Sequence, residues 1–138
     1  MDSCVICAEA RGLDTPLAFS DEVAAAFPAR FRSTRNPGAV LVVTKLHCPT
    51  LDELPTELIG PFFERLRRIA VAVRQVSGAD GTTLVQNNHP PGQELPHLHV
   101  HVIPRFNGDG WPLTETIEIG GEERRRWAER LSTALLDE

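Results

Sequence analysis

The chain has 138 residues, of which 41% are hydrophobic and 24% are charged, a composition typical of a single globular domain over 1–138. Its formal net charge of −5 argues against a nucleic-acid-binding protein, which usually carries a basic surplus. The apolar run Ile-Ala-Val-Ala-Val in the middle of the chain is far too short to span a membrane. We therefore expect neither nucleic acid nor a membrane as a partner.

The first residues, MDSCVICAEARG, have no basic flank and no apolar segment, so they do not resemble a signal peptide. We expect a cytoplasmic protein whose three cysteines are free thiols. In a reducing compartment, two cysteines separated by two residues, such as Cys4 and Cys7, indicate a metal site or a redox pair. A redox pair needs the motif where a strand ends and a helix starts, which this N-terminus does not clearly show.

The first clear elements are a strand and a long helix. Residues 39–44 are apolar and rich in β-branched side chains, which predicts a buried strand. Apolar residues recur at spacings of three and four over 56–77, which predicts a helix that ends at Gly78. Pro61 lies within this pattern, where it either kinks the helix or marks its first position after a short opening turn.

The second half of the chain adds two strands and a helix. Residues 82–86 suit a strand, 87–94 a loop, and 95–103 alternate cleanly as another strand. Residues 122–136 predict a terminal helix with apolar positions at Trp127, Leu131 and Leu135. The segment 8–36 gives no clear signal. This order predicts an α+β fold in which one long helix covers an antiparallel sheet.

Three of the five histidines lie on the strand predicted over 95–103. Because side chains alternate along a strand, His97, His99 and His101 share one face, which we expect to be exposed to solvent. His97 and His101 would be about 13 Å apart along a straight strand, too far for one metal ion to bind all three. Neutral imidazole attacks phosphorus well, so we favour a nucleophile flanked by helper histidines over a polar sheet face that happens to carry them.

Uncharged polar residues come shortly before this strand. Gly92 lets the backbone approach a ligand closely, and Gln93 offers an amide donor to a phosphate oxygen. Gln86, Asn87 and Asn88 add polar groups at the end of the preceding strand. Such a cluster can bind an anionic phosphate although the cluster itself carries no strong positive charge.

The stretch PGQELPHLHVHVIPR resembles the signature of the histidine-triad (HIT) nucleotide hydrolases and transferases, a Gly-Gln pair followed by His-x-His-x-His. NPGAVLVVTKLH is similar to another segment of that family. The resemblance spans most of residues 1–110. It implies a HIT-like antiparallel sheet of about five strands with one long helix and a C-terminal helix, and a homodimer that uses the long helix and a neighbouring strand.

By this resemblance, the middle histidine, His99, is the nucleophile and forms a covalent nucleotidyl intermediate that water then hydrolyses. His101 would lie near the phosphate and the leaving group, and Gln93 would bind the phosphate. Further substrate contacts are expected from Gln86, Asn88 and Gly92. The implied reaction is hydrolysis at the α-phosphorus of an AMP-linked phosphoramidate or dinucleoside polyphosphate. Nucleotidyl transfer or phosphorolysis, and a nucleotide-binding regulatory role with incidental catalysis, stay open.

Taken alone, the cysteine pair is half of a zinc site, or a pair of surface thiols near the terminus. Candidates for the other two ligands are His47, Cys48, His89 and one histidine of the strand. A zinc-bearing, bacterial-type branch of HIT proteins resembles this chain, and it implies a structural zinc bound by Cys4, Cys7, His47 and His97. Cys48 is then a bystander.

Three features depart from the family pattern. Thr44 stands at a usual proline and Asn88 at a usual glycine. The segment that normally contacts the ribose reads FPARFRSTRNPG, where the expected polar position falls near Phe31. We expect nearby arginines either to contact phosphates or to be solvated surface residues: Arg30, Arg32 and Arg35.

Overall fold

The computed structural model describes residues 4–112 and 116–136. Five strands form one antiparallel sheet in the order β1 (Phe19–Ser20), β2 (Ala24–Pro28), β4 (Val40–Thr44), β6 (His99–Arg105) and β5 (Gly81–Val85). A smaller sheet pairs β3 (Phe31–Ser33) with β7 (Thr116–Glu118). The helices are α1 (Val5–Ala10), the 3-10 turn η1 (Leu51–Glu53), α2 (Thr56–Ser77) and α3 (Gly121–Leu136). These elements confirm the predicted α+β fold, while a single domain over 1–138 stays a prediction.

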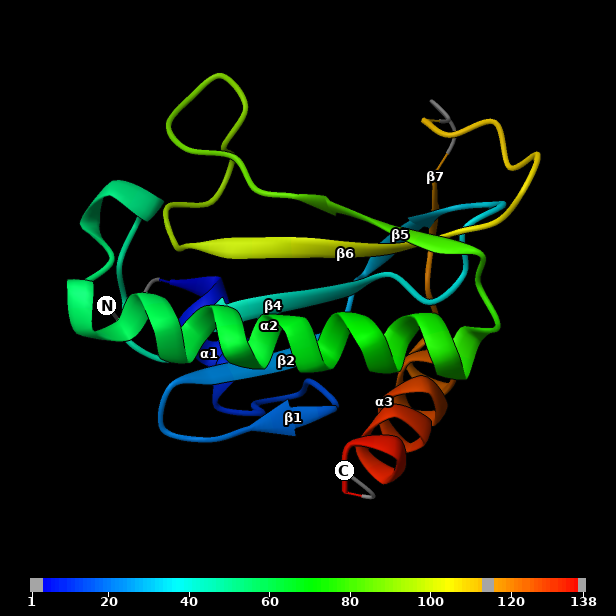
Figure 1. Cartoon of the computed structure of the whole chain (residues 1–138), viewed down its shortest axis with the longest axis horizontal. Coiled ribbons are helices and arrows are strands. Elements are labelled where there is room, and N and C mark those ends of the chain that lie inside the picture. The colour runs from blue at the N-terminus through cyan, green and yellow to red at the C-terminus, as the bar shows by residue number, and fades with distance from the viewer. Residues whose placement is uncertain (1–3, 113–115, 137–138) are drawn as a thin grey trace.

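Helices α2 and α3 cover one face of the sheet, where α2 lies in front of the strands (Figure 1). The buried apolar positions of both helices recur at the spacing of three and four that the sequence predicts. The buried residues that meet there are Phe62, Leu66, Ile69 and Val73 of α2, Leu131 and Leu135 of α3, and Val40, Val42, Val100 and Val102 of the sheet. Burial of this apolar surface is the main stabilisation of the fold.

The predicted bounds of α2 agree with the structure. Gly78 takes the left-handed conformation with φ of 72°, which only glycine adopts without strain, and its N–H caps the helix end. Pro61 lies inside the helix, so it does not mark the first helical position. None of the helices in the described ranges is long and apolar enough to cross a membrane.

Helix α1 covers the opposite face of the sheet, and the sequence did not predict it. Its residues Ile6 and Ala10 pack against Ala25, Phe27 and Val43 of the sheet. In Figure 1, α1 lies behind the strands, on the side away from α2. Both faces of the sheet are therefore covered where α1 packs on β2 and β4.

The strand predicted over 95–103 forms over His99–Arg105 instead. Residues before His99 make other contacts: the Leu98 N–H donates to the Cys48 carbonyl at 2.8 Å, and the His97 N–H donates to the Leu95 carbonyl at 2.9 Å. His97 therefore precedes β6 and is free to take a direction that strand alternation does not impose. The strand predicted over 82–86 forms over Gly81–Val85, which leaves Gln86 just beyond its end.

Candidate active site and metal centre

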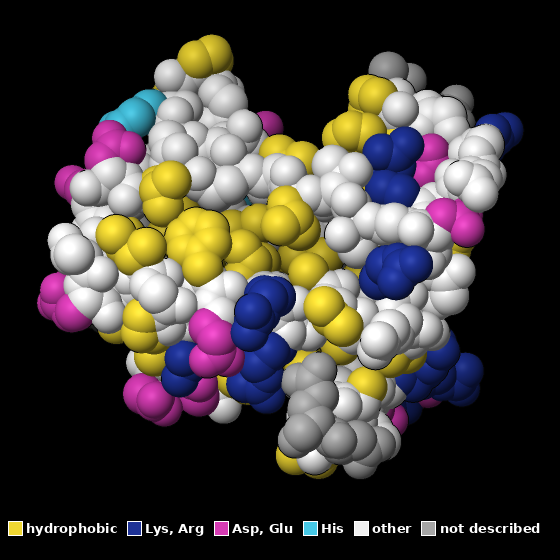
Figure 2. Space-filling model, in the orientation of Figure 1, with side chains coloured by type: hydrophobic (Ala, Val, Ile, Leu, Met, Phe, Trp, Pro, Cys, Tyr) yellow, Lys and Arg dark blue, Asp and Glu magenta, His cyan; other side chains and the backbone are white. Residues whose placement is uncertain are grey.

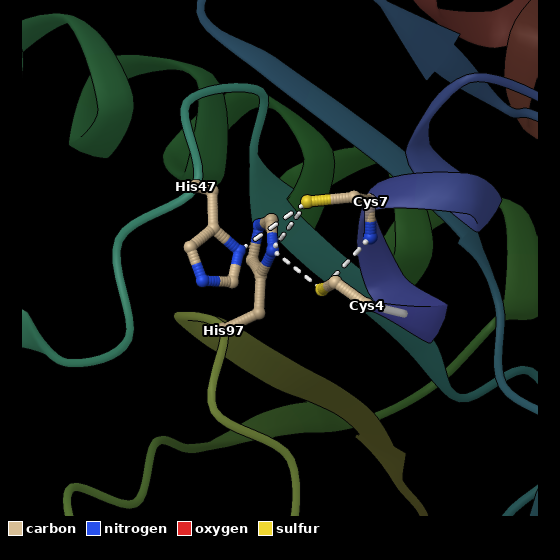
Figure 3. Close-up of side chains that lie close together, drawn as sticks. All are labelled: Cys4, Cys7, His47 and His97. Atoms are coloured by element: carbon tan, nitrogen blue, oxygen red, sulfur yellow. Dashed lines mark hydrogen bonds between the residues drawn. The ribbon is translucent and has the colours of Figure 1, made fainter. Parts of the chain in front are cut away.

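Two cysteines and two histidines from three distant parts of the chain converge on one point (Figure 3). Cys4 and Cys7 come from the start of α1, His47 from the loop after β4, and His97 from the segment before β6. The sulfur of Cys7 lies 3.3 Å from Nδ1 of His47, and Nδ1 of His97 lies 3.4 Å from both sulfurs. The structure thus brings together the four residues that the resemblance implied as ligands.

The spacing of these atoms suits a tetrahedral cation. With metal–sulfur bonds of about 2.3 Å and metal–nitrogen bonds of about 2.0–2.1 Å, a tetrahedron separates sulfur from nitrogen by about 3.5 Å. The observed sulfur–nitrogen distances of 3.3–3.4 Å are close to this value, and all four ligand atoms lie within 4.8 Å of one another. The cluster can therefore hold a metal ion without rearrangement of the backbone.

A hydrogen bond and burial keep the His97 ring in the orientation and the neutral form that bind a metal ion. Its Nε2 donates to the backbone carbonyl of Thr44 at 2.8 Å, so the proton stays on Nε2 and Nδ1 faces the sulfurs. Burial lowers the pKa of His97, which is completely buried, and so keeps the imidazole in the neutral form that binds metals. Burial raises the pKa of the Cys7 thiol, and a bound divalent cation would favour the thiolate instead.

Two other candidate ligands lie outside this cluster. Cys48 packs with Leu54 and Leu98 in a small apolar cluster, and its sulfur is 3.9 Å from the Thr44 hydroxyl. His89 instead pairs with Asp52, with Nε2 3.0 Å from the carboxylate oxygen. The prediction of Cys48 as a bystander agrees with this placement.

The next two histidines lie side by side on β6. The rings of His99 and His101 are edge to face, with centroids 5.2 Å apart. Nδ1 of His99 lies 2.6 Å from the backbone carbonyl oxygen of His97, which can only accept a hydrogen bond, so the His99 proton resides on Nδ1. In the neutral ring, the lone pair is therefore on the second nitrogen, Nε2.

The environment of His101 keeps its ring neutral. Burial, with a smaller contribution from His99, lowers the pKa of His101 to about 4. At neutral pH His101 therefore presents an uncharged imidazole next to His99, which can donate a hydrogen bond from one nitrogen and accept one at the other.

The expectation that the histidine face is exposed to solvent is wrong. His99 is only 8% exposed and His97 is fully buried. His99 pairs across the sheet with Val43, which packs against α1. The short helix thus covers part of the face that alternation alone would leave to water, and the imidazole of His99 lies in a partly desolvated place.

Gln93 is held in place by both ends of its amide. Its Oε1 accepts the N–H of His89 at 2.8 Å, and its Nε2 donates to the carbonyl of Pro49 at 2.6 Å. An amide nitrogen carries two N–H groups, so one remains for a ligand. Gln93 is only 8% exposed, and its orientation is fixed in advance of any binding.

The other predicted substrate residues border the same loop. Gln86 and Asn88 exchange two side-chain hydrogen bonds of 2.9 and 2.8 Å, and Asn88 also accepts the Leu51 N–H at 2.7 Å. A Cβ added to Gly92 would lie 3.2 Å from the Asn87 side chain, so packing against Asn87 is what restricts this position. The structure gathers these residues in the loop between β5 and β6, next to the start of β6.

Two of the three arginines near the expected ribose segment, Arg30 and Arg32, have protein partners. Arg30 pairs with the buried Glu9 at 3.3 Å, and Arg32 pairs with Glu123 at 3.2 Å. Phe31, near which a polar residue was expected, begins β3 and is 58% exposed. These contacts give Arg30 and Arg32 structural roles. The sequence could not have shown them, because Glu9 lies in α1 and Glu123 in α3, both far from the arginines along the chain.

Comparisons with known proteins agree with this geometry. The HIT domain model matches residues 15–108. The HIT-like protein MJ0866 of Methanocaldococcus jannaschii is 34% identical over 119 residues, covering 85% of this chain and 87% of that protein. The adenosine 5'-monophosphoramidase hnt1 of Schizosaccharomyces pombe is 27% identical over 139 residues, covering 96% and 98%. A zinc-bound histidine triad family protein from Mycobacterium smegmatis matches with a TM-score of 0.80 at 30% identity, covering 99% and 95%.

The match to the HIT domain covers more than half of the chain and includes β6 with its histidines. The relative from Methanocaldococcus jannaschii extends the likeness over most of both chains. The chain therefore belongs to the HIT domain family.

Proposed function

We propose that this protein is a nucleotide hydrolase in which His99 attacks the α-phosphorus of an AMP-linked substrate. The observation that carries the proposal is the 2.6 Å hydrogen bond from His99 Nδ1 to the His97 carbonyl. It places the proton on the nitrogen that does not react and fixes the ring, so Nε2 presents a lone pair.

The proposed reaction consists of two displacements at phosphorus. In the first, the Nε2 lone pair of His99 forms a nitrogen–phosphorus bond while the bond to the leaving group breaks. In the second, water attacks the phosphorus, the nitrogen–phosphorus bond breaks, and a proton from the water leaves to solvent. Dividing one difficult displacement into two lowers the barrier of each.

His101 and Gln93 are proposed to hold the reacting groups. His101, neutral because its pKa is about 4, can donate a hydrogen bond to a phosphate oxygen or to the leaving group. Gln93 keeps one amide N–H on Pro49 and offers the other to a phosphate oxygen. Fixed donors of this kind stabilise charge that develops in the transition state. The remaining substrate contacts are assigned to Gln86, Asn88 and Gly92.

We assign a structural zinc to the site formed by Cys4, Cys7, His47 and His97. The donor set of two sulfurs and two nitrogens is typical of a closed zinc site, and the similar Mycobacterium smegmatis structure is zinc-bound. When bound there, zinc would hold α1 against the segment that leads into β6. The residues of the chain, and not the metal, then perform the chemistry at His99.

The preferred substrate is best identified by a screen of AMP-linked compounds. The similar protein of Schizosaccharomyces pombe is named as an adenosine 5'-monophosphoramidase, which supports phosphoramidates as the first class to test. The screen tests adenosine phosphoramidate and dinucleoside tri- and tetraphosphates separately and measures the release of AMP. We expect at least one of them to be hydrolysed with a kcat of about 1 per second or more.

Product analysis separates hydrolysis from its rivals. If added inorganic phosphate or a sugar phosphate appears in the nucleotide product, the protein is a transferase or phosphorylase. If nucleotides bind but every substrate turns over far below about 1 per second, the nucleotide-binding regulatory role is supported. AMP as the product with and without added phosphate supports the hydrolase.

We also propose that the protein forms a homodimer through α2 and β5. Strand β5 lies at the edge of the sheet. Two apolar side chains of α2 and one of β5 are 43–48% exposed: Phe63, Val71 and Leu84. Figure 2 shows hydrophobic side chains gathered over α2 and β5 on this face. An apolar patch next to an unpaired strand edge is a surface that a second copy can cover.

Light scattering at micromolar concentration is expected to give twice the chain mass of 15.2 kDa. Val71→Glu and Leu84→Lys together should give the monomer, because charges at the centre of an apolar interface are costly. Leu136→Lys is a matched control on α3, since Leu136 is 82% exposed and outside the patch. A wild-type monomer, or a dimer that survives both changes, refutes this assembly.

A cytoplasmic location remains part of the proposal. So does the expectation that the partners are a small nucleotide and a second copy of the chain, with no nucleic acid and no membrane.

A further inference from the structure

The cysteine pair lies at the start of the six-residue helix α1. Cys4 is the N-cap residue of α1, and its sulfur accepts the backbone N–H of Cys7 at 3.3 Å. The support for a redox role of the pair therefore comes from the closeness of the two sulfurs, and not from a strand-to-helix placement.

Both thiols are free, and their surroundings differ. The two sulfurs lie within 4.8 Å of each other, and Cys4 is partly exposed while Cys7 is buried. A disulfide needs its sulfurs at about 2.05 Å, a change within the range of side-chain rotation for two cysteines of one CxxC motif. An oxidant from solvent can therefore reach Cys4, and Cys7 is positioned to react with it next.

We propose that Cys4 and Cys7 form a redox switch in which peroxide oxidises the pair to a disulfide and expels the zinc. The Cys4 thiolate attacks an oxygen of hydrogen peroxide, which breaks the O–O bond and gives a sulfenic acid and hydroxide. The Cys7 thiolate then attacks the Cys4 sulfur, the S–S bond forms, and a second hydroxide leaves. Two protons convert the hydroxides to water, and the zinc, now without its two thiolate ligands, is released. Two thiolates are thus oxidised and one peroxide is reduced.

Oxidation of the cysteine pair can affect His99 through the backbone of His97, its neighbour in the metal cluster. Loss of the sulfur ligands leaves His97 held by its Nε2 bond to the Thr44 carbonyl, which does not depend on the metal. The His97 carbonyl in turn accepts the hydrogen bond from His99 Nδ1. Oxidation should therefore lower turnover several-fold without abolishing it, and this one consequence rests on the proposed function.

Cys48 allows the pair to be studied alone. It is 4% exposed, packs with Leu54 and Leu98, and is not among the four clustered residues. Replacing it with alanine leaves Cys4 and Cys7 as the two remaining thiols. Cleavage after Arg11 also releases both in one peptide, so a disulfide between them appears as the loss of two hydrogen atoms from that peptide.

The test titrates the zinc-loaded Cys48→Ala protein with hydrogen peroxide and measures thiols, zinc after desalting, and the mass of the N-terminal peptide. We expect two thiols and one zinc to be lost together, and dithiothreitol followed by zinc sulfate to restore both. Cys7→Ser in the same background should show no intramolecular disulfide. None of these measurements uses turnover, so they stand apart from the proposed reaction.

Three results would overturn the switch. The first is zinc that stays bound after both thiols are oxidised. The second is retention of both thiols and zinc at peroxide levels that oxidise a zinc-loaded CxxC peptide. The third is a reduced protein that takes up no zinc when zinc sulfate is added.

Discussion

Replacing His99 with alanine is expected to lower kcat by on the order of 10⁴-fold or more, while nucleotide binding survives. The substitution removes the only nitrogen that the proposed mechanism uses as a nucleophile, whereas Gln93 and His101 keep their positions. The kcat and the nucleotide Kd, measured on the substrate found by the screen, check this result. His101→Ala should slow the reaction less, because His101 assists a step and forms no bond to phosphorus.

A matched control removes a histidine from the neighbouring loop. His89 is exposed and pairs with Asp52, and its φ of 64° makes asparagine a better replacement than alanine. His89→Asn should change kcat by only a few-fold. A loss as large as that of His99→Ala would show that general damage to the loop, and not loss of a nucleophile, explains the result.

The covalent intermediate gives a second, independent readout. Rapid quenching without acid should trap a nucleotidyl adduct on the wild-type protein with a slow substrate, and peptide mapping should place it on His99. His99→Gly leaves a cavity at a nearly buried position, so added imidazole should restore part of the turnover. An adduct on another residue, or wild-type turnover in His99→Ala, contradicts the mechanism.

Replacing Cys4 and Cys7 together with serine is expected to remove the zinc completely and to lower the midpoint of thermal unfolding. Zinc contributes about 10–16 kcal/mol to small zinc-finger peptides. The effect here should be smaller, several kcal/mol, because Ile6 and Ala10 still pack against the sheet. Elemental analysis of protein purified without chelator and a thermal unfolding curve measure the two effects.

Two controls make this result specific to the metal. Cys48→Ala should keep one zinc per chain, because Cys48 lies outside the cluster. A strong chelator should lower the unfolding midpoint of the wild type towards that of the double variant and leave the double variant unchanged. Full zinc occupancy in the double variant would refute the assigned ligands.

Local pattern alone determined much of this protein. The spacing of apolar residues over Thr56–Ser77, together with Gly78 at the end, gave the bounds of α2, because helix periodicity and its stop signal are both local. Alternation placed His99 and His101 on the same face of a strand, and their rings do lie side by side. The HIT motif in the sequence also agrees with the family to which the chain belongs.

The tertiary structure decided what surrounds these residues. Helix α1 has only six residues, too few to be stable alone, and it forms because Ile6 and Ala10 pack on the sheet. Strand β2 is buried at every position, so it shows no alternation to predict it. The contacts of His97 with Cys4 and Cys7, and the hydrogen bond from the Gln93 amide to the Pro49 carbonyl, join segments separated by 44 residues or more. No local sequence pattern encodes such contacts, because they depend on how the whole chain packs.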